Sequence, residues 1–142
     1  MSPEKIFSLC STLAMISWII LIFFTFWKNR DRYLLASVII LFCLIYAWLI
    51  FSNMSPGTLD SFGTLDGVSK LFSNKTVLLA GWVHYLAFDL LAGIYIVRNA
   101  RQVGINHWLL VPALILTFML GPVGLLIYFI MRLFKTKNIL DN

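Results

Sequence analysis

Four long apolar stretches, almost free of charge, constrain the fold of this chain more than any other feature. They cover residues 6–27, 33–51, 77–97 and 108–131. A helix of about 20 apolar residues crosses the hydrocarbon core of a bilayer, because each residue advances about 1.5 Å. Backbone amides in lipid must also find their hydrogen bonds within the helix. We therefore predict an all-α, four-transmembrane-helix bundle with helices over residues 6–27, 33–51, 77–97 and 108–134.

The composition agrees with this assignment and excludes several other classes of protein. The 142 residues are 61% hydrophobic and 12% charged, and the net charge of +5 comes from Lys and Arg at the ends of the predicted helices. Such residues contact lipid headgroups, so we predict membrane lipids and not nucleic acid as partners. Cys10 and Cys43 stand alone on different apolar helices and are interpreted as packing residues. We expect no metal and no cofactor.

The turns between the stretches predict a single membrane domain made of two helical hairpins. The links at 28–32 and 98–107 are short, and a longer connector covers 52–76. Within the connector, apolar residues recur at helical spacing, which is typical of a short helix lying flat on a membrane. These residues are Phe62, Leu65, Val68, Leu71 and Phe72. Such a helix could be a lid over a lateral opening or a plain interfacial anchor.

The location and orientation follow less directly from the sequence. The first apolar run is too long for a cleaved signal peptide, and five residues precede it, so we expect a bacterial inner (plasma) membrane. With four crossings, six basic residues lie on one side and five on the other. This difference sets no orientation. A homo-oligomer is left open.

The third stretch contains the two ionisable residues that the predicted membrane core holds, His84 and Asp89. Asp89 is the thirteenth residue of its stretch and is expected near the midplane, where a charged carboxylate costs about 2.5–3.5 kcal/mol on insertion scales. At about 100° per residue, Trp82, Tyr85 and Gly93 share a side with Asp89, whereas His84 lies about 140° away beside Phe88. A neutral acid and a neutral base in an apolar pocket could move protons on a lipid-soluble substrate. The alternative is that Asp89 holds the bundle together through Tyr46 or Thr117.

The fourth stretch contains Thr117, followed by Gly121 and Pro122. Proline has no N–H to donate to the carbonyl of Phe118, so we predict a kink here. A kink opposite Asp89 would open a cavity near the midplane, or it could be a packing notch alone. Weak alternatives, such as haem ligation by His84 and His107, lack a second pair of facing histidines.

Three segments of the second half resemble a known family. The segments are 81–90 (GWVHYLAFDL), 104–107 (GINH) and 116–125 (LTFMLGPVGL). They are similar to the small membrane proteins of the abscisic-acid-deficient, neoxanthin-synthase type, which include bacterial members. The resemblance implies the isomerisation of an epoxy-carotenoid, violaxanthin, to the allenic carotenoid neoxanthin.

The resemblance and the residues together give a functional hypothesis. The hypothesis is that the protein binds a carotenoid or related lipophilic isoprenoid. In its stronger form, the hypothesis is that the protein also isomerises this ligand. Asp89 would protonate the epoxide oxygen and His84 would remove the vinylic proton, which are their predicted catalytic roles. The predicted ligand-binding residues are Trp82, Tyr85, Phe88, Gly93, Thr117, Gly121 and Pro122. The alternatives are a small proton-coupled transporter that uses the midplane Asp89, and a scaffold subunit with no ligand.

Overall fold

Three long helices form the body of the protein. The computed structural model describes residues 2–53, 58 and 60–138, and its regular elements there are all helical. The first helix is α1 (Pro3–Phe23) and the last is α5 (Lys75–Gln102). The middle one runs without a break through α2 (Arg30–Tyr33), a π-helical stretch η1 (Leu34–Ile39) and α3 (Ile40–Asn53). Each is long and apolar enough to cross a membrane, which confirms long apolar helices at the first three predicted crossings.

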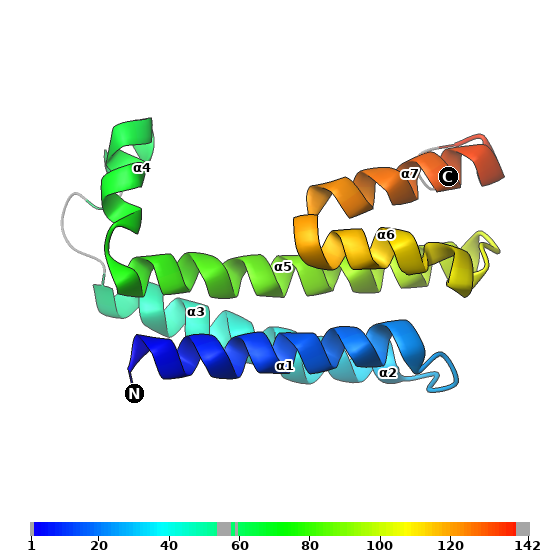
Figure 1. Cartoon of the computed structure of the whole chain (residues 1–142), viewed down its shortest axis with the longest axis horizontal. Coiled ribbons are helices and arrows are strands. Elements are labelled where there is room, and N and C mark those ends of the chain that lie inside the picture. Colours follow the sequence, from blue (N-terminus) through cyan, green and yellow to red (C-terminus); the bar gives the residue numbers. More distant parts are fainter. Residues whose placement is uncertain (1, 54–57, 59, 139–142) are drawn as a thin grey trace.

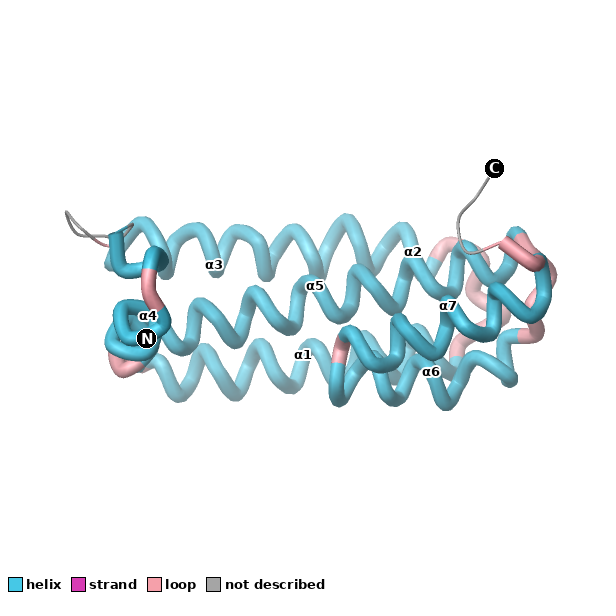
Figure 2. Tube along the Cα trace, turned by 90° about the horizontal axis from the view of Figure 1, so that it is seen from above, coloured by secondary structure: helices cyan, strands magenta, loops and turns pink. Residues whose placement is uncertain are grey.

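Helix α5 is the centre of the bundle, with α1 and α3 packed on either side of it (Figure 2). Ala80, Ala87 and Ala100 of α5 are all buried. Because their side chains are small, neighbouring helices can approach α5 closely. The first two crossings are antiparallel but meet near their shared turn, through α2 and η1. The prediction that they are antiparallel neighbours therefore holds near the shared turn, and α5 lies between α1 and α3 along the rest of their length.

The fourth predicted crossing is two short helices. Helix α6 (His107–Leu120) has 14 residues and α7 (Pro122–Thr136) has 15, so each is about 21–22 Å long, short of the roughly 30 Å of the hydrocarbon core. Helix α7 folds back along α6, and both lie beside the second half of α5 (Figure 1). The prediction of one continuous helix over 108–134 is wrong. In place of a fourth long helix, the described part of the chain has a hairpin of two shorter helices, which would enter the membrane and return to the same side.

The reversal has a local cause in the sequence. Pro122 has no N–H, and Gly121 adopts φ +43° and ψ −95°, a backbone conformation that residues with a Cβ rarely take. Gly124 then lets the backbone of α7 lie directly on α6 at Thr117, because a Cβ at Gly124 would collide with it. Proline and both glycines together turn the expected kink into a full reversal.

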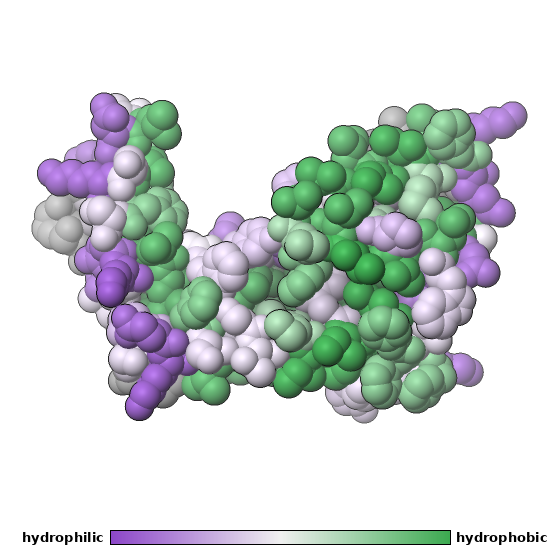
Figure 3. Space-filling model, viewed as in Figure 1, coloured by the Kyte–Doolittle hydropathy of each residue, from purple (hydrophilic) through white to green (hydrophobic). Residues whose placement is uncertain are grey.

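The surface is the reverse of that of a soluble bundle. Large apolar side chains are exposed along the helices, among them Met15, Leu44 and Leu126, which are 55%, 64% and 59% exposed. Hydrophilic residues gather at the two ends of the long helices (Figure 3). An apolar belt between two polar ends fits a protein surrounded by lipid.

The hairpin changes the distribution of charge. Because α7 returns to the end where α5 and α6 are joined, the basic residues at its end join those of the 24–29 and 103–106 turns. Eight of the 11 basic residues now lie at this end, which we call the basic end: Lys28, Arg30, Arg32, Arg98, Arg101, Arg132, Lys135 and Lys137. The opposite end has Lys5, Lys70 and Lys75. The near-equal split expected for four crossings is replaced by a clear bias.

The connector forms the predicted short helix at the opposite end. Helix α4 (Leu65–Phe72) follows a single 3-10 turn, η2 (Asp60–Gly63), and the Thr64 side chain caps it by accepting a hydrogen bond from the Gly67 N–H at 3.1 Å. Helix α4 stands across the axis of the long helices (Figure 1). Residues 54–57 and 59 of the predicted connector lie outside the described part.

Candidate functional site

The protein is hollowed on one side, between α4 and the α6–α7 hairpin (Figure 3). In this hollow lies a groove of about 720 Å³, lined by residues of α1, α4 and the first half of α5. It exists because the hairpin stops at Gly121, which lies against Asp89, the fifteenth of the 28 residues of α5. The first half of α5 is thus left uncovered on this side, and we call the space the lateral groove.

Three aromatic rings from two helices follow one another in the lateral groove. The Phe7 and Trp82 rings are 5.4 Å apart, and the Trp82 and Tyr85 rings are also 5.4 Å apart. The Trp82 indole N–H donates a hydrogen bond to the Ser11 hydroxyl of α1 at 3.0 Å, which fixes the ring between the two helices. Such a row of fixed, partly exposed rings is a suitable surface for a long, flat, apolar molecule.

The wall formed by α4 approaches α5 most closely at Phe72 and Gly81 among the glycine contacts of the described residues. The Phe72 ring lies on Gly81 of α5, where an added Cβ would be 2.5 Å from the nearest ring atom. A glycine at this point allows the close approach of α4. Because Phe72 and Gly81 both line the lateral groove, the position of α4 determines the shape of its outer end.

Tyr85 connects the lateral groove to the hairpin tip. Its hydroxyl lies 3.3 Å from the Phe118 carbonyl and 3.1 Å from the Met119 carbonyl, and it donates to these two oxygens. The Phe118 carbonyl is the one that Pro122 leaves without its helical donor. A hydroxyl from another helix thus satisfies an acceptor that would otherwise be exposed to lipid, at a net gain of about 0.5–1.5 kcal/mol.

Asp89 lies one turn further along α5, under the hairpin turn. It is 8% exposed, and its Oδ2 has no hydrogen-bond partner among the described residues. A Cβ at Gly121 would be 2.7 Å from its Oδ1, so the carboxyl group is packed against the glycine. The Tyr85 hydroxyl also interacts with this carboxyl group.

His84 lies at the edge of the lateral groove, on the outside of the protein. Its ring is 4.5 Å from that of Phe88 and 5.5 Å from that of Tyr46. The groove is lined by His84 but not by Asp89. The structure therefore does not bring the two predicted catalytic groups together in this groove, and their chemical roles stay predictions.

The other predicted ligand-binding residues divide into two groups. Trp82 and Tyr85 line the lateral groove, and Phe88 lies beside it on His84. Gly93 is covered by the Trp18 ring, from which an added Cβ would be 2.6 Å away. Thr117 is fully buried between α6 and α7 and donates to the Ala113 carbonyl at 2.8 Å, and not to Asp89. Gly121 and Pro122 form the turn of the hairpin.

Sequence reasoning missed Phe7 and Phe72, which line the lateral groove from outside the second half of the chain. Phe7 is one apolar residue among many on α1, and nothing in the sequence distinguishes it. Phe72 was expected on an interfacial helix, but its contact with Gly81 depends on how α4 folds back. The signal in the sequence that could have indicated this contact is a large aromatic residue on one predicted helix together with a glycine on another.

These features define a class of protein: a helical membrane protein with three helices long and apolar enough to cross a bilayer, a hairpin of two shorter helices, and a lateral aromatic groove next to a buried carboxyl group. Groups of three or more side chains suited to metal binding are absent from the residues that the structure describes. The sequence profile of the ABA DEFICIENT 4-like family matches residues 5–128, so the chain belongs to this family. The resemblance found in the three sequence segments is thereby confirmed. No curated protein and no solved structure matches the chain.

Proposed function

We propose that this protein binds a carotenoid or a related linear isoprenoid in the lateral groove and isomerises it by acid–base chemistry. The observation that carries the proposal is the groove itself: about 720 Å³, with three aligned aromatic rings, next to a hydroxyl that interacts with a buried carboxyl group. A polyene could move from the lipid into this space sideways, without passing through water. Membership of the ABA DEFICIENT 4-like family supports this class of ligand.

In the proposed reaction an epoxy-carotenoid becomes an allenic one with no change of oxidation state. A proton added to the epoxide oxygen opens one C–O bond and gives a hydroxyl group, and the vinylic proton leaves to form the allene. We assign the first step to Asp89, with the Tyr85 hydroxyl passing its proton into the groove, and the second to His84. The proton gained by the imidazole must then return to the carboxylate before the next cycle.

The charge bias of the basic end bears on the alternative of a small transporter. That alternative rested partly on a near-equal split of basic residues, which would permit insertion in both orientations. With eight basic residues at one end and three at the other, a single orientation is favoured. In a bacterial inner membrane, our proposed location, the basic end would face the cytoplasm. The lateral groove would then open into the outer leaflet.

The direct test of binding is to identify what copurifies with the protein in mild detergent. We expect an organic extract to contain a polyene or another isoprenoid by absorbance and mass spectrometry. The Trp82→Ala variant should lose most of it, because the central ring of the groove is removed. Trp48→Ala is the matched control, since Trp48 is 56% exposed on α3 and does not line the groove. Equal recovery from both variants would contradict binding in the groove.

The test of catalysis is separate from the test of binding. Purified protein in nanodiscs is incubated with violaxanthin, and chromatography measures neoxanthin. Removal of a general acid typically lowers the rate by about 10²–10⁴-fold, and we expect losses of this size for Asp89→Asn and for His84→Gln, with binding retained. Full activity in either variant would remove that residue from the mechanism. Binding without conversion by the parent protein would leave a carotenoid-binding protein and overturn the isomerase assignment.

A further inference from the structure

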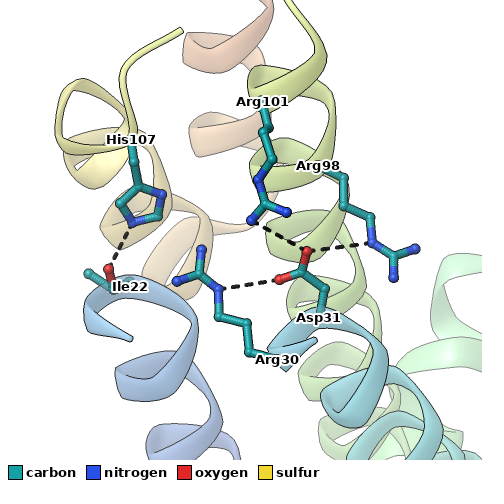
Figure 4. Close-up of polar contacts among 6 residues, drawn as sticks. All are labelled: Ile22, Arg30, Asp31, Arg98, Arg101 and His107. Carbon is teal, nitrogen blue, oxygen red and sulfur yellow. Dashed lines mark hydrogen bonds and ion pairs between the residues drawn. The ribbon is translucent and has the colours of Figure 1, made fainter. Parts of the chain in front are cut away.

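The basic end contains a cluster of buried and partly buried charges that the proposed reaction does not use. Asp31 is surrounded by three guanidinium groups (Figure 4). Its Oδ1 is 3.3 Å from Arg30 Nε, and its Oδ2 is 3.7 Å from Arg98 Nε and 3.8 Å from Arg101 Nη2. Asp31 is the acidic residue of this end within the described part. The cluster therefore has a net charge of +2 before Lys28 and Arg32 of the same turn are counted.

Arg30 is the unusual member of this cluster. It is 1% exposed, and its Nη1 has no hydrogen-bond partner among the described residues. Its Nε donates a hydrogen bond to Asp31 Oδ1. The other two nitrogens of the guanidinium group, which we call its free end, point toward the space between His107 and Arg101 (Figure 4). A buried cationic nitrogen without an acceptor is unfavourable, because it has lost its hydration and gained nothing in return.

The free end of Arg30 faces a small, partly open cavity. A cavity of about 150 Å³ is lined by Thr25, Arg30, Arg101 and His107 together with apolar side chains. This volume exceeds several-fold the ~30 Å³ that one water molecule occupies in the liquid. His107 Nε2 lies 2.8 Å from the Ile22 carbonyl, and since a carbonyl oxygen accepts, Nε2 carries the hydrogen. This hydrogen bond ties the end of α1 to the start of α6 and so fixes the cavity wall.

The cavity adjoins a second, more open space on the other side of Arg101. This groove of about 360 Å³ is lined by polar and charged residues, including Lys28, Arg32 and Arg98. Arg101 lines both spaces. A ligand bound beside Arg30 would therefore have cationic groups on several sides.

We propose that this cluster is a binding site for a phosphate group. Its net positive charge calls for an anion, and the Arg30 and Arg101 guanidinium groups offer the planar sets of N–H donors that match tetrahedral oxyanions. The Thr25 hydroxyl can donate a further hydrogen bond. The phosphate can belong to a lipid headgroup, since the site lies at the end of the membrane helices, or be free inorganic phosphate.

Three probes distinguish the two sources on delipidated protein in mild detergent. They are inorganic phosphate, dihexanoyl phosphatidic acid and dihexanoylglycerol, which has the same acyl chains and no phosphate. Calorimetry gives the Kd and thermal unfolding gives the stabilisation. Binding of the phosphatidic acid alone assigns a lipid headgroup, and binding of inorganic phosphate alone assigns the free ion. Binding of both supports the shared chemistry, whereas binding of neither overturns the proposal.

Two variants test whether these arginines hold the ligand. Arg101→Gln removes a side chain that is 55% exposed, so the fold should tolerate it. Arg30→Lys keeps a cation beside Asp31 but removes the unpaired nitrogen. Each should weaken binding about tenfold or more, because hydrogen bonds to charged groups are the strong ones. If Arg30→Lys does not fold, Arg101→Gln decides alone.

The matched control removes one positive charge from the same end without touching either space. Lys135 lies in the last turn of α7 and lines neither the cavity nor the groove. Lys135→Gln should leave the Kd within about threefold of the parent value, because exposed charges are screened by salt. An equal loss in Lys135→Gln and Arg101→Gln would mean a general charge effect and would overturn the site. Parent-like binding in Arg101→Gln would do the same.

Discussion

The two halves of α5 differ in how far they are covered, although they belong to one helix: five residues are buried before Asp89 and eight from Asp89 onward. From Asp89 onward the helix is enclosed by α1, η1, α6 and α7. The buried residues of this half are Asp89, Leu90, Gly93, Ile94, Ile96, Val97, Asn99 and Ala100. In the first half, Leu78, Trp82, His84 and Phe88 are all exposed. The covered half is a packed core, and the uncovered half is the side of a groove.

The hairpin accounts for this difference. Had α6 continued past Leu120 as one helix, it would have covered the first half of α5 as well. Because Gly121 and Pro122 reverse the chain beside Asp89, one half of α5 becomes core and the other half stays open to lipid. The carboxyl group lies at the boundary between the two. The lateral groove is thus a consequence of where the hairpin ends.

The largest expected effect concerns the topology that creates these two halves. Three crossings and a re-entrant hairpin put the chain ends on opposite sides of the membrane, whereas four crossings would put them on the same side. In a chain with Cys10 and Cys43 replaced by Ala, we expect Ser2→Cys and Asn138→Cys to react from opposite sides with an impermeant thiol reagent. The result is all or none. Labelling of both positions from one side would contradict the hairpin.

The boundary itself can be broken at Gly121. Gly121→Ala forces an unfavourable backbone conformation and brings a Cβ within 2.7 Å of Asp89 Oδ1, so we expect a loss of about 2–5 kcal/mol in the free energy of unfolding. Unfolding by SDS in mixed micelles measures it. The lateral groove should also lose its ligand.

Gly104 provides the matched control for this substitution. It also has a positive φ, +71°, but an added Cβ would have no atom within 4 Å. Gly104→Ala should therefore cost about 1–2 kcal/mol, from the backbone alone. Equal losses in the two variants would mean that the contact between Gly121 and Asp89 contributes nothing.

Much of the covered half could be predicted from the sequence, because hydrophobic length and proline chemistry are local signals. The three crossings, the burial of Asp89 near the middle of α5 and the importance of the Phe118 carbonyl all follow from them. The reversal of the chain between α6 and α7 could not be predicted in this way, because Pro122 in a long apolar run is equally compatible with a kink in a single helix. It takes Gly121 at φ +43° and the contact of Gly124 with Thr117 to make a hairpin.

The lateral groove was harder to predict than the helices. Trp82 and Tyr85 were identified because they share a side of one helix with Asp89. Phe7 and Phe72 belong to other elements, and their approach depends on packing between α1, α4 and α5. The phosphate-binding cluster escaped notice for the same reason, since Arg30 and Arg101 looked like ordinary interfacial charges. Helical periodicity predicts which residues share a face of one helix, but it does not predict which helices pack against each other.

A smaller effect is expected where the lateral groove joins the hairpin tip. Tyr85→Phe removes the hydrogen bonds to the Phe118 and Met119 carbonyls and leaves acceptors facing lipid. We expect a loss of about 1–2 kcal/mol in the free energy of unfolding. Tyr95→Phe is the control, because Tyr95 contacts α7 through its ring, with centroids 6.3 Å from Tyr128 and 6.4 Å from Phe129. A larger loss in Tyr95→Phe than in Tyr85→Phe would contradict the proposed role of the hydroxyl.

The smallest effect concerns the outer wall of the open half. Phe72→Ala removes the ring that rests on Gly81, but Phe72 is 37% exposed, so the loss of global stability should be within about 1 kcal/mol. Hydrogen exchange should nonetheless rise in α4 and stay unchanged in α6 and α7, because α4 depends on this contact and the hairpin does not. Leu65→Ala is the control on the same helix, since Leu65 is 84% exposed. If exchange in α4 is the same in both variants, other contacts hold the wall, and Phe72 shapes the groove without fixing α4.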